Sequence, residues 1–273
     1  MSDANTNRWW ESFHVIEMAD ILLDRNDKQL DTTLGFFLRE LNLSSGDRVF
    51  DQCCGVGSVS IPLAEKGLIV EGCDLFAPYI ERANQIVSQR WKGQPEKAPK
   101  FFVADAFEFT TAEPCNAAFN WYSSFGYAAD DTTNMQMLKR AFESLKPGGR
   151  YGIDIPNFPG VFRGFKEKMI QEGVSDGREV RLERTCAPDF TTGLLHQSWQ
   201  WYIDGEPTTL RKSACKMYLP NQVVEMLTES GFELIQLFGN EDGDRFQMDS
   251  PRLIITARKK PVSYTHLTLP TKA

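Results

Sequence analysis

The sequence contains no long hydrophobic run and no recognisable secretory leader. None of its 273 residues lies in an apolar stretch of ~18 residues, about the length that a membrane-spanning helix requires. The first residues, MSDANTNRWWESFH, lack the basic and then apolar pattern of a secretory signal. We therefore expect a cytoplasmic protein that does not use a membrane as a partner.

Metal-binding spacings are also missing. Of the six cysteines, Cys53 and Cys54 are adjacent and the others are scattered, and no Cys-x-x-Cys pair or His-rich spacing occurs. Structural zinc sites need such clustered ligands, so we expect no metal site. Adjacent cysteines strain badly when they bridge each other, which favours reduced thiols packed as small hydrophobic side chains.

Positive charge is scarce relative to negative charge. Lys and Arg together number 30 and Asp and Glu number 37, which gives a formal net charge of −7 and a pI of about 5.2. The one basic cluster in the sequence is Arg258-Lys259-Lys260. Nucleic-acid enzymes usually carry a basic face, so we expect a small molecule and not DNA or RNA as the partner. The sequence carries no signal for an oligomeric state.

Strand-like and helix-like patterns alternate along most of the chain. The strand-like runs are 48–50, 68–73, 100–103, 117–121, 150–155, 232–238 and 253–257, and the helix-like runs between them are 58–66, 78–91, 132–145 and 221–230. Two more helical patterns precede them, at 9–24 and 30–41. Alternation at this spacing implies a mainly parallel sheet with helices on both faces. We predict an α/β fold with a Rossmann-like doubly wound sheet.

One segment interrupts the alternation. Residues from about 177 to 218 are rich in Thr, Trp and Tyr with period-two stretches, and the turn Asp204-Gly205 predicts a hairpin. We therefore predict an antiparallel β insertion at 156–218 that caps the acceptor site. The expected domain division is a helical N-terminal cap at 1–41, a core at 42–155 and 219–260, this insertion, and a tail at 261–273. The tail resembles translated adapter sequence and is excluded from functional reasoning together with His266.

Three predicted strands in succession end in an aspartate. The first, within VFDQCCGVG, carries Asp51 and leads into a turn with Gly55 and Gly57, where the backbone can approach a ligand closely. The second ends at Asp74, about 20 residues later, where an acid can accept hydrogen bonds from ribose hydroxyls. The third ends at Asp105. Because parallel strands end at the same edge of a sheet, the three carboxylates point to a nucleoside-containing ligand.

This ordered set of motifs resembles the class I S-adenosylmethionine-dependent methyltransferases over about residues 41–260. In that family the first strand is followed by Asp-x-Gly-x-Gly-x-Gly, and here Cys53 replaces the first glycine between Asp51 and Gly55. The later segments LKPGGR, ESGF and SPRLI supply further matches. The resemblance implies a seven-stranded sheet whose last strand runs antiparallel.

The resemblance also implies the cofactor and its ligands. The cofactor would be S-adenosylmethionine, which leaves as S-adenosylhomocysteine. Asp51 and the glycine turn would lie beside its methionine moiety, Asp74 would hold the ribose, and Asp105 with Ala106 the adenine. The residues implied in cofactor binding are Asp51, Cys53, Gly55, Gly57, Asp74, Leu75, Asp105, Ala106, Asn120 and Trp121.

A nicotinamide-dependent dehydrogenase is the main alternative for the cofactor. Those enzymes also use a glycine-rich turn and an acid after the second strand, but their Gly-x-Gly-x-x-Gly pattern needs a third glycine beside the pyrophosphate. Here Ser60 stands at that position. S-adenosylmethionine has no pyrophosphate, so the sequence favours methyl transfer over hydride transfer.

The acceptor side is defined less sharply. An amine needs only to be neutral when it attacks, whereas a hydroxyl or carbon acceptor requires a general base within about 3 Å. The candidate catalytic residues are Asp154, His14, His196 and Tyr122. Aromatic residues of the N-terminus and the insertion, such as Trp10, Phe13, Trp199 and Trp201, could close over the site but are more typical of a buried core.

We therefore expect methyl transfer to a nitrogen or oxygen atom, or alternatively to carbon or sulfur, of a small metabolite. A second hypothesis is a scaffold or regulatory homologue that binds the cofactor without turnover, which the changed residue at Cys53 would favour. A third, an RNA or protein methyltransferase, is weakened because the segment Asn120-Trp121-Tyr122-Ser123 is not an Asn-Pro-Pro-Tyr motif.

Overall fold

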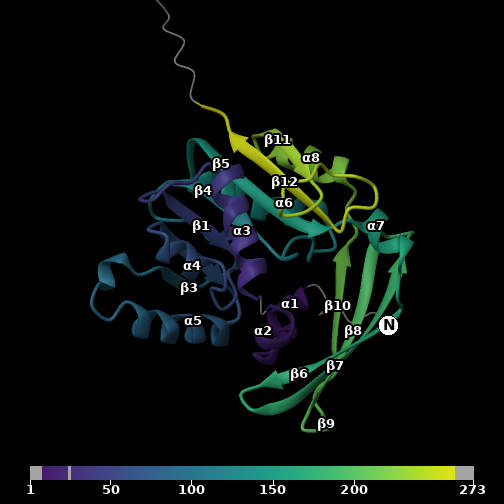
Figure 1. The fold of residues 1–273 in the computed structure, drawn as a ribbon. Helices are drawn as coiled ribbons and strands as arrows, with labels where there is room; N and C mark the ends of the chain where they lie inside the picture. The colour runs from purple at the N-terminus through teal and green to yellow at the C-terminus, as the bar shows by residue number, and fades with distance from the viewer. Residues whose placement is uncertain (1–7, 24–25, 262–273) are drawn as a thin grey trace, which may run out of the picture.

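Two β-sheets form the body of the protein (Figure 1). The computed structural model describes residues 8–23 and 26–261. The tail predicted at 261–273 therefore lies outside the described residues from position 262 onward. Within the described ranges, no helix is both long and apolar enough to cross a membrane.

The larger sheet has seven strands in the order β11-β12-β5-β4-β1-β2-β3. Its strands are β1 (Arg48–Gln52), β2 (Ile69–Asp74), β3 (Lys100–Val103), β4 (Cys115–Asn120), β5 (Leu145–Pro156), β11 (Phe232–Phe238) and β12 (Arg252–Lys259). Strands β1 to β5 pair in parallel, and β12 runs antiparallel to both β11 and β5. The predicted seven-stranded sheet with an antiparallel last strand is confirmed. The strand order reverses between β1 and β4, and ligands of such sheets bind beside this reversal at the carboxyl ends of the strands.

Helices cover both faces of the larger sheet, as the alternation predicts. Their bounds are α3 (Asp27–Glu40), α4 (Ser60–Glu65), α5 (Ala77–Arg90), α6 (Asp131–Ser144) and α8 (Pro220–Glu229), and the short 3-10 helix η2 (Pro95–Lys97) precedes β3. On one face, α6 and α8 bury their apolar residues against Tyr151 and Ile153 of β5. On the other face, α3 and α4 pack around Val49 and Phe119. Side chains that alternate along the strands thus fill two separate cores.

The smaller sheet corresponds to the predicted insertion. Its order is β10-β8-β7-β6, with β9 paired to β8, and all of its pairs are antiparallel. Its strands are β6 (Lys168–Ser175), β7 (Arg178–Asp189), β8 (Leu194–Ile203), β9 (Glu206–Pro207) and β10 (Arg211–Lys216). The hairpin at Asp204-Gly205 is confirmed, with φ of 51° and 85°. Asp176-Gly177 turns β6 into β7 with similar angles, 49° and 76°, because Asp tolerates and Gly favours the left-handed region.

The N-terminal segment packs on the inner face of the smaller sheet. The helical pattern from residue 9 resolves into two short helices, α1 (Trp10–Phe13) and α2 (Glu17–Leu22), because the chain is extended at His14 with ψ of 150°. Phe13 joins Trp199 and Trp201 in one buried cluster. The period-two alternation of the two tryptophans therefore marks a buried sheet face, and this face meets helices rather than solvent.

Candidate active site

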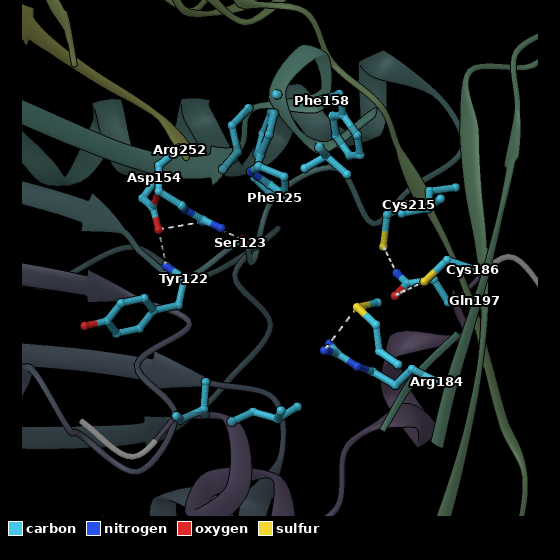
Figure 2. A pocket seen from close by; sticks show the side chains of 18 of the residues that line it. Tyr122, Ser123, Phe125, Asp154, Phe158, Arg184, Cys186, Gln197, Cys215 and Arg252 are labelled. Atoms are coloured by element: carbon cyan, nitrogen blue, oxygen red, sulfur yellow. Dashed lines mark hydrogen bonds and ion pairs between the residues drawn. The ribbon is translucent and has the colours of Figure 1, made fainter. Parts of the chain in front are cut away.

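A cavity of about 1210 Å³ lies between the carboxyl edge of the larger sheet and the inner face of the smaller one. Its walls come from α1 and α2, the loop after β4, the end of β5 with α7 (Phe158–Arg163), and strands β6, β7, β8 and β10 (Figure 2). Small-molecule pockets usually measure about 300–1,000 Å³. The cavity is therefore large enough for a whole metabolite.

The turn after β1 adopts the backbone that its glycines permit. Cys53, Gly55 and Gly57 all have positive φ, at 67°, 55° and 77°. A Cβ on Gly57 would lie 2.9 Å from the Cζ of Phe101, so the turn passes too close to its neighbours for a side chain there. Cys53 thus adopts the left-handed conformation that glycine favours.

Asp51, at the end of β1, is a buried carboxyl group. Its Oδ2 accepts a hydrogen bond of 2.7 Å from the hydroxyl of Ser60, the residue that occupies the position of the third glycine in dehydrogenases. Burial raises the pKa of Asp51 to about 7, against the opposing effect of the Ser60 hydrogen bond. The group is therefore poised to gain or lose its charge near neutral pH.

Asp74, at the end of β2, is held by the backbone of the turn. Its two oxygens accept hydrogen bonds of 2.9 Å from the N–H groups of Gly55 and Phe76. Desolvation raises the pKa of Asp74, and desolvation lowers the pKa of the facing His14 although the Asp74 charge opposes that change. The contacts fix the carboxylate at the crevice beside the first turn, next to Leu75.

Asp105 and Ala106 follow β3. One Asp105 oxygen accepts a hydrogen bond of 2.9 Å from the N–H of Phe107, and the other pairs with the guanidinium of Arg8. The carbonyl of the buried Ala106 accepts a hydrogen bond of 3.2 Å from Gln52 Nε2. Sequence reasoning missed both residues. Arg8 belongs to no motif, and Gln52 stands inside the motif at the end of β1 but was given no role there.

Asn120, at the end of β4, carries a polar atom without a partner. Its side chain is fully buried, and its Nδ2 lies 3.8 Å from the sulfur of Cys53. Its Oδ1 has no hydrogen-bond partner among the described residues. Buried acceptors of this kind are rare because they lose their bonds to water. The side chain of the next residue, Trp121, turns away into the core against Phe37, so only its backbone borders the crevice.

These groups fit S-adenosylmethionine. Carboxylates end three successive strands, and their oxygens can accept hydrogen bonds from an ammonium, from ribose hydroxyls and from an adenine amino group. Asn120 adds an acceptor that lacks a donor.

Tyr122 and Ser123 form a strained loop at the rim of the cavity. Both have positive φ, 58° and 73°, which costs of order 1–3 kcal/mol for each such residue. Asp154 of β5 accepts a hydrogen bond of 3.1 Å from the Tyr122 N–H, and Arg252 donates one of 2.6 Å to the Ser123 hydroxyl. Arg252 also binds both oxygens of Asp154 at 2.7 Å (Figure 2). The ion pair thus holds the loop in its strained conformation.

Glu241, in the loop after β11, completes this rim. Its two carboxylate oxygens accept hydrogen bonds of 2.7 Å from the indole N–H of Trp121 and from the hydroxyl of Thr33. The hydroxyl of Tyr122 lies 3.5 Å from the same Thr33 oxygen. Sequence reasoning missed Glu241, because one acid in a polar loop has no distinguishing pattern.

The structure brings two of the four candidate catalytic residues to the cavity. Asp154 and Tyr122 both line it. His14 faces Asp74 on the cofactor side, and its Nδ1 lies 3.4 Å from the carbonyl of Trp10. His196 is exposed on the outer face of β8, whereas its neighbour Gln197 lines the cavity. The structure therefore does not bring His196 to the site.

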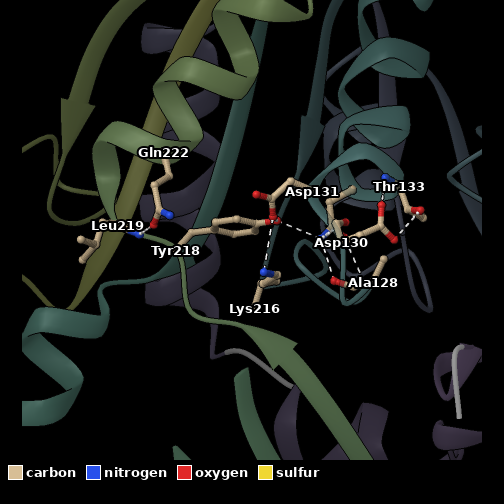
Figure 3. Close-up of polar contacts among 9 residues, drawn as sticks. Ala128, Asp130, Asp131, Thr133, Lys216, Tyr218, Leu219 and Gln222 are labelled. Carbon is tan, nitrogen blue, oxygen red and sulfur yellow. Dashed lines mark hydrogen bonds and ion pairs between the residues drawn. The ribbon is translucent and has the colours of Figure 1, made fainter. Parts of the chain in front are cut away.

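The insertion is fixed where it leaves the larger sheet and where it returns. At the exit, Asn157 Nδ2 donates to the carbonyls of Met248 and Ser250 at 3.0 and 2.8 Å. At the return, the hydroxyl of Tyr218 donates to Asp131 of α6 at 2.8 Å and accepts from Asn134 Nδ2 at 2.9 Å (Figure 3). Both ends of the smaller sheet are therefore tied to the larger one beside the cavity.

Comparison with known proteins finds related chains. The family described as a methyltransferase domain matches residues 49–149, which run from β1 into β5. The Bacillus subtilis (strain 168) protein YqeM, which is named as a methyltransferase, is 32% identical over 223 residues, or 81% of this chain and 87% of the relative.

Solved structures share the fold. The CcbJ methyltransferase from Streptomyces caelestis has a TM-score of 0.74 at 15% identity and covers 92% of this chain and 98% of its own. An amino pentose methyltransferase from Micromonospora echinaspora, solved with bound S-adenosylmethionine, has a TM-score of 0.64 at 16% identity, with 91% and 98% covered. At such identities the likeness concerns the fold.

The left-handed conformation of Cys53 leads to a stability prediction. Replacement Cys53→Gly removes the cost of a positive φ at a non-glycine residue, so we expect the free energy of unfolding to rise by about 0.5–1 kcal/mol in urea denaturation. The matched variant Gly57→Ala, in the same turn, should lower it, because the new Cβ would meet Phe101. A loss of stability in Cys53→Gly would contradict this account.

The hydrogen bonds of the Tyr218 hydroxyl lead to a second stability prediction. Tyr218→Phe removes the hydroxyl that bonds Asp131 and Asn134, so the free energy of unfolding should fall by about 1–2 kcal/mol. Tyr202→Phe, on the outer face of β8, serves as the control and should change it by less than about 0.5 kcal/mol. Equal effects of the two changes would show that these hydrogen bonds contribute nothing.

Proposed function

This chain belongs to the class I S-adenosylmethionine-dependent methyltransferases, and from that membership we propose that it transfers the methyl group to a nitrogen or oxygen atom of a small metabolite. The observation that carries the proposal is the cavity of about 1210 Å³, which joins the carboxyl edge of the larger sheet to the smaller sheet. A site between two sheets and the helices beside them encloses a small acceptor and excludes water from it.

The cofactor side follows from the strand ends. Asp51 and Asn120 would bind the methionine moiety, Asp74 with Leu75 the ribose, and Asp105 with Ala106 the adenine. When bound, S-adenosylmethionine supplies an electrophilic methyl group that the acceptor atom displaces. The residues of this chain align the two reactants, and such alignment can account for a large part of a rate enhancement.

Among the possible acceptor atoms, a nitrogen fits the cavity best. A hydroxyl acceptor needs a general base, and none of the histidines in the described part of the chain lines the cavity. The oxygens of Asp154 already accept hydrogen bonds from Arg252 and from the Tyr122 N–H, which suits a positioning role. A neutral amine attacks without a base. The likeness in fold to an amino pentose methyltransferase agrees with an amine acceptor.

The first experiment is calorimetric titration with S-adenosylmethionine, S-adenosylhomocysteine and NADH. We expect the first two to bind and the third not to bind, after which a panel of amines and alcohols is screened for methylated products by mass spectrometry. Binding of NADH alone would overturn the proposed function. Binding of the first two without any methylated product in the panel would support the scaffold hypothesis instead.

Removal of the Asp74 carboxylate tests the cofactor site. We expect Asp74→Ala to abolish binding of S-adenosylhomocysteine and Asp74→Asn to weaken it by at least about tenfold, because the ribose hydroxyls lose a charged acceptor. Asn retains one oxygen, which can accept from one of the two N–H groups that Asp74 binds, and circular dichroism should show an intact fold. The exposed Asp249→Ala is the control. Unchanged affinity in both Asp74 variants would contradict the assignment.

The raised pKa of Asp51 predicts a pH dependence. The ammonium of the cofactor prefers the ionised carboxylate, and this group takes up a proton as the pH falls below its pKa of about 7. Affinity for S-adenosylhomocysteine should therefore decrease below pH 7, by up to about tenfold per pH unit. Asp51→Asn should bind weakly at every pH and lack this slope. A slope that persists in Asp51→Asn would assign it to another group.

A further inference from the structure

Arg184 is a cation on the inner wall of the smaller sheet. It lies on β7, opposite Met169 of β6 and Trp199 of β8, and all three side chains line the cavity. Its guanidinium stacks over the Trp199 ring at 5.1 Å from the centroid. Figure 2 shows it on the wall opposite Tyr122, across the open space.

This guanidinium has no acidic partner among the residues that the structure describes. Its Nη2 makes one weak contact, 3.9 Å to the sulfur of Met169, and its buried Nε has no hydrogen bond. Desolvation by burial lowers the pKa of Arg184, and no carboxylate counters this. A half-buried cation without a counterion is costly, which points to a ligand that supplies the missing charge.

The other cations of the lining are either paired or exposed. Arg252 is paired with Asp154 and Lys216 with Asp131, whereas Lys28 and Lys166 are exposed. One buried and uncompensated positive charge therefore faces the cavity from the described part of the chain. A monoanion balances one charge, and a planar carboxylate matches the planar donor geometry of a guanidinium.

We propose that Arg184 forms a subsite for a carboxylate of the methyl acceptor, so that the substrates of this protein are small organic acids that carry an amine or hydroxyl group. This inference rests on the proposed function, because it presumes that the cavity receives the acceptor. The acid group binds against Arg184, whose guanidinium stacks on the Trp199 ring. The reactive end then extends across the cavity to the loop at Tyr122 and Ser123.

The test is a set of binding measurements with three probes of similar size, phenylacetate, phenylacetamide and phenyl phosphate. Each is titrated by calorimetry into the wild-type protein saturated with S-adenosylhomocysteine. We expect phenylacetate to bind at least about tenfold more tightly than phenylacetamide, because the charge-assisted pair is made with the acid alone. We also expect it to bind more tightly than phenyl phosphate. Equal binding of acid and amide, no binding of the acid, or a preference for the phosphate would each overturn the proposal.

Two variants and one control assign the preference to Arg184. Arg184→Gln should bring the affinity ratio of acid to amide close to one, and Arg184→Lys should keep part of it. Arg181→Gln, on the same strand with its side chain exposed and paired to Glu172 and Glu183, should keep all of it. If the preference survives in Arg184→Gln, the subsite lies elsewhere and the proposal fails.

The same samples separate this proposal from the proposed function. All variants are first titrated with S-adenosylhomocysteine, whose affinity should not change, because Arg184 is on the far wall from the cofactor-side carboxylates. If the wild-type protein does not bind S-adenosylhomocysteine, this result counts against the proposed function. An unchanged cofactor affinity together with a lost acid preference in Arg184→Gln would support the carboxylate subsite on its own.

Discussion

The ion pair between Asp154 and Arg252 is the contact on which the acceptor side of the site depends. It joins the end of β5 to the start of β12, and through the backbone of Tyr122 and the hydroxyl of Ser123 it also holds the loop after β4. Asp154 is 2% exposed, so removal of its partner would leave a buried charge at a cost of about 3–5 kcal/mol. The antiparallel strand β12 therefore contributes to the site, because its Arg252 holds Tyr122 and Ser123 in their left-handed conformation at the cavity.

The two halves of the site use opposite physical means. On the cofactor side, carboxylates at the strand ends are fixed by backbone N–H groups, as Asp74 is by Gly55 and Phe76. On the acceptor side, the wall contains aromatic rings from the N-terminal segment, the loop after β4, α7 and the smaller sheet. The first arrangement suits a ligand with many polar groups, whereas the second suits a smaller ligand that is shielded from water, in line with the proposed function.

Much of the fold could be predicted from the sequence, because strands buried on both faces and helices of regular spacing leave clear patterns. The strand-end aspartates could be found for the same reason. The single helix expected from residue 9 was wrong, since Phe13 and Ile16 continue the apolar spacing although the chain extends at His14. Arg184 and His196 show that the sequence alone does not tell which face of a strand points into the cavity. Consecutive residues of a strand point to opposite faces of the sheet. Which face lines the cavity is decided by the packing of the sheet against α1 and α2.

Asn157 binds the loop before β12 and Tyr218 binds α6, so both ends of the insertion are fixed to the body that surrounds the larger sheet. A segment whose two ends are both fixed to a rigid support can change in sequence, length or strand number without disturbing the register of the seven central strands. Half of the acceptor wall is therefore modular. In evolution or in engineering, the segment that carries the smaller sheet can be replaced as one unit to change the substrate, while the residues at the strand ends of the larger sheet stay the same.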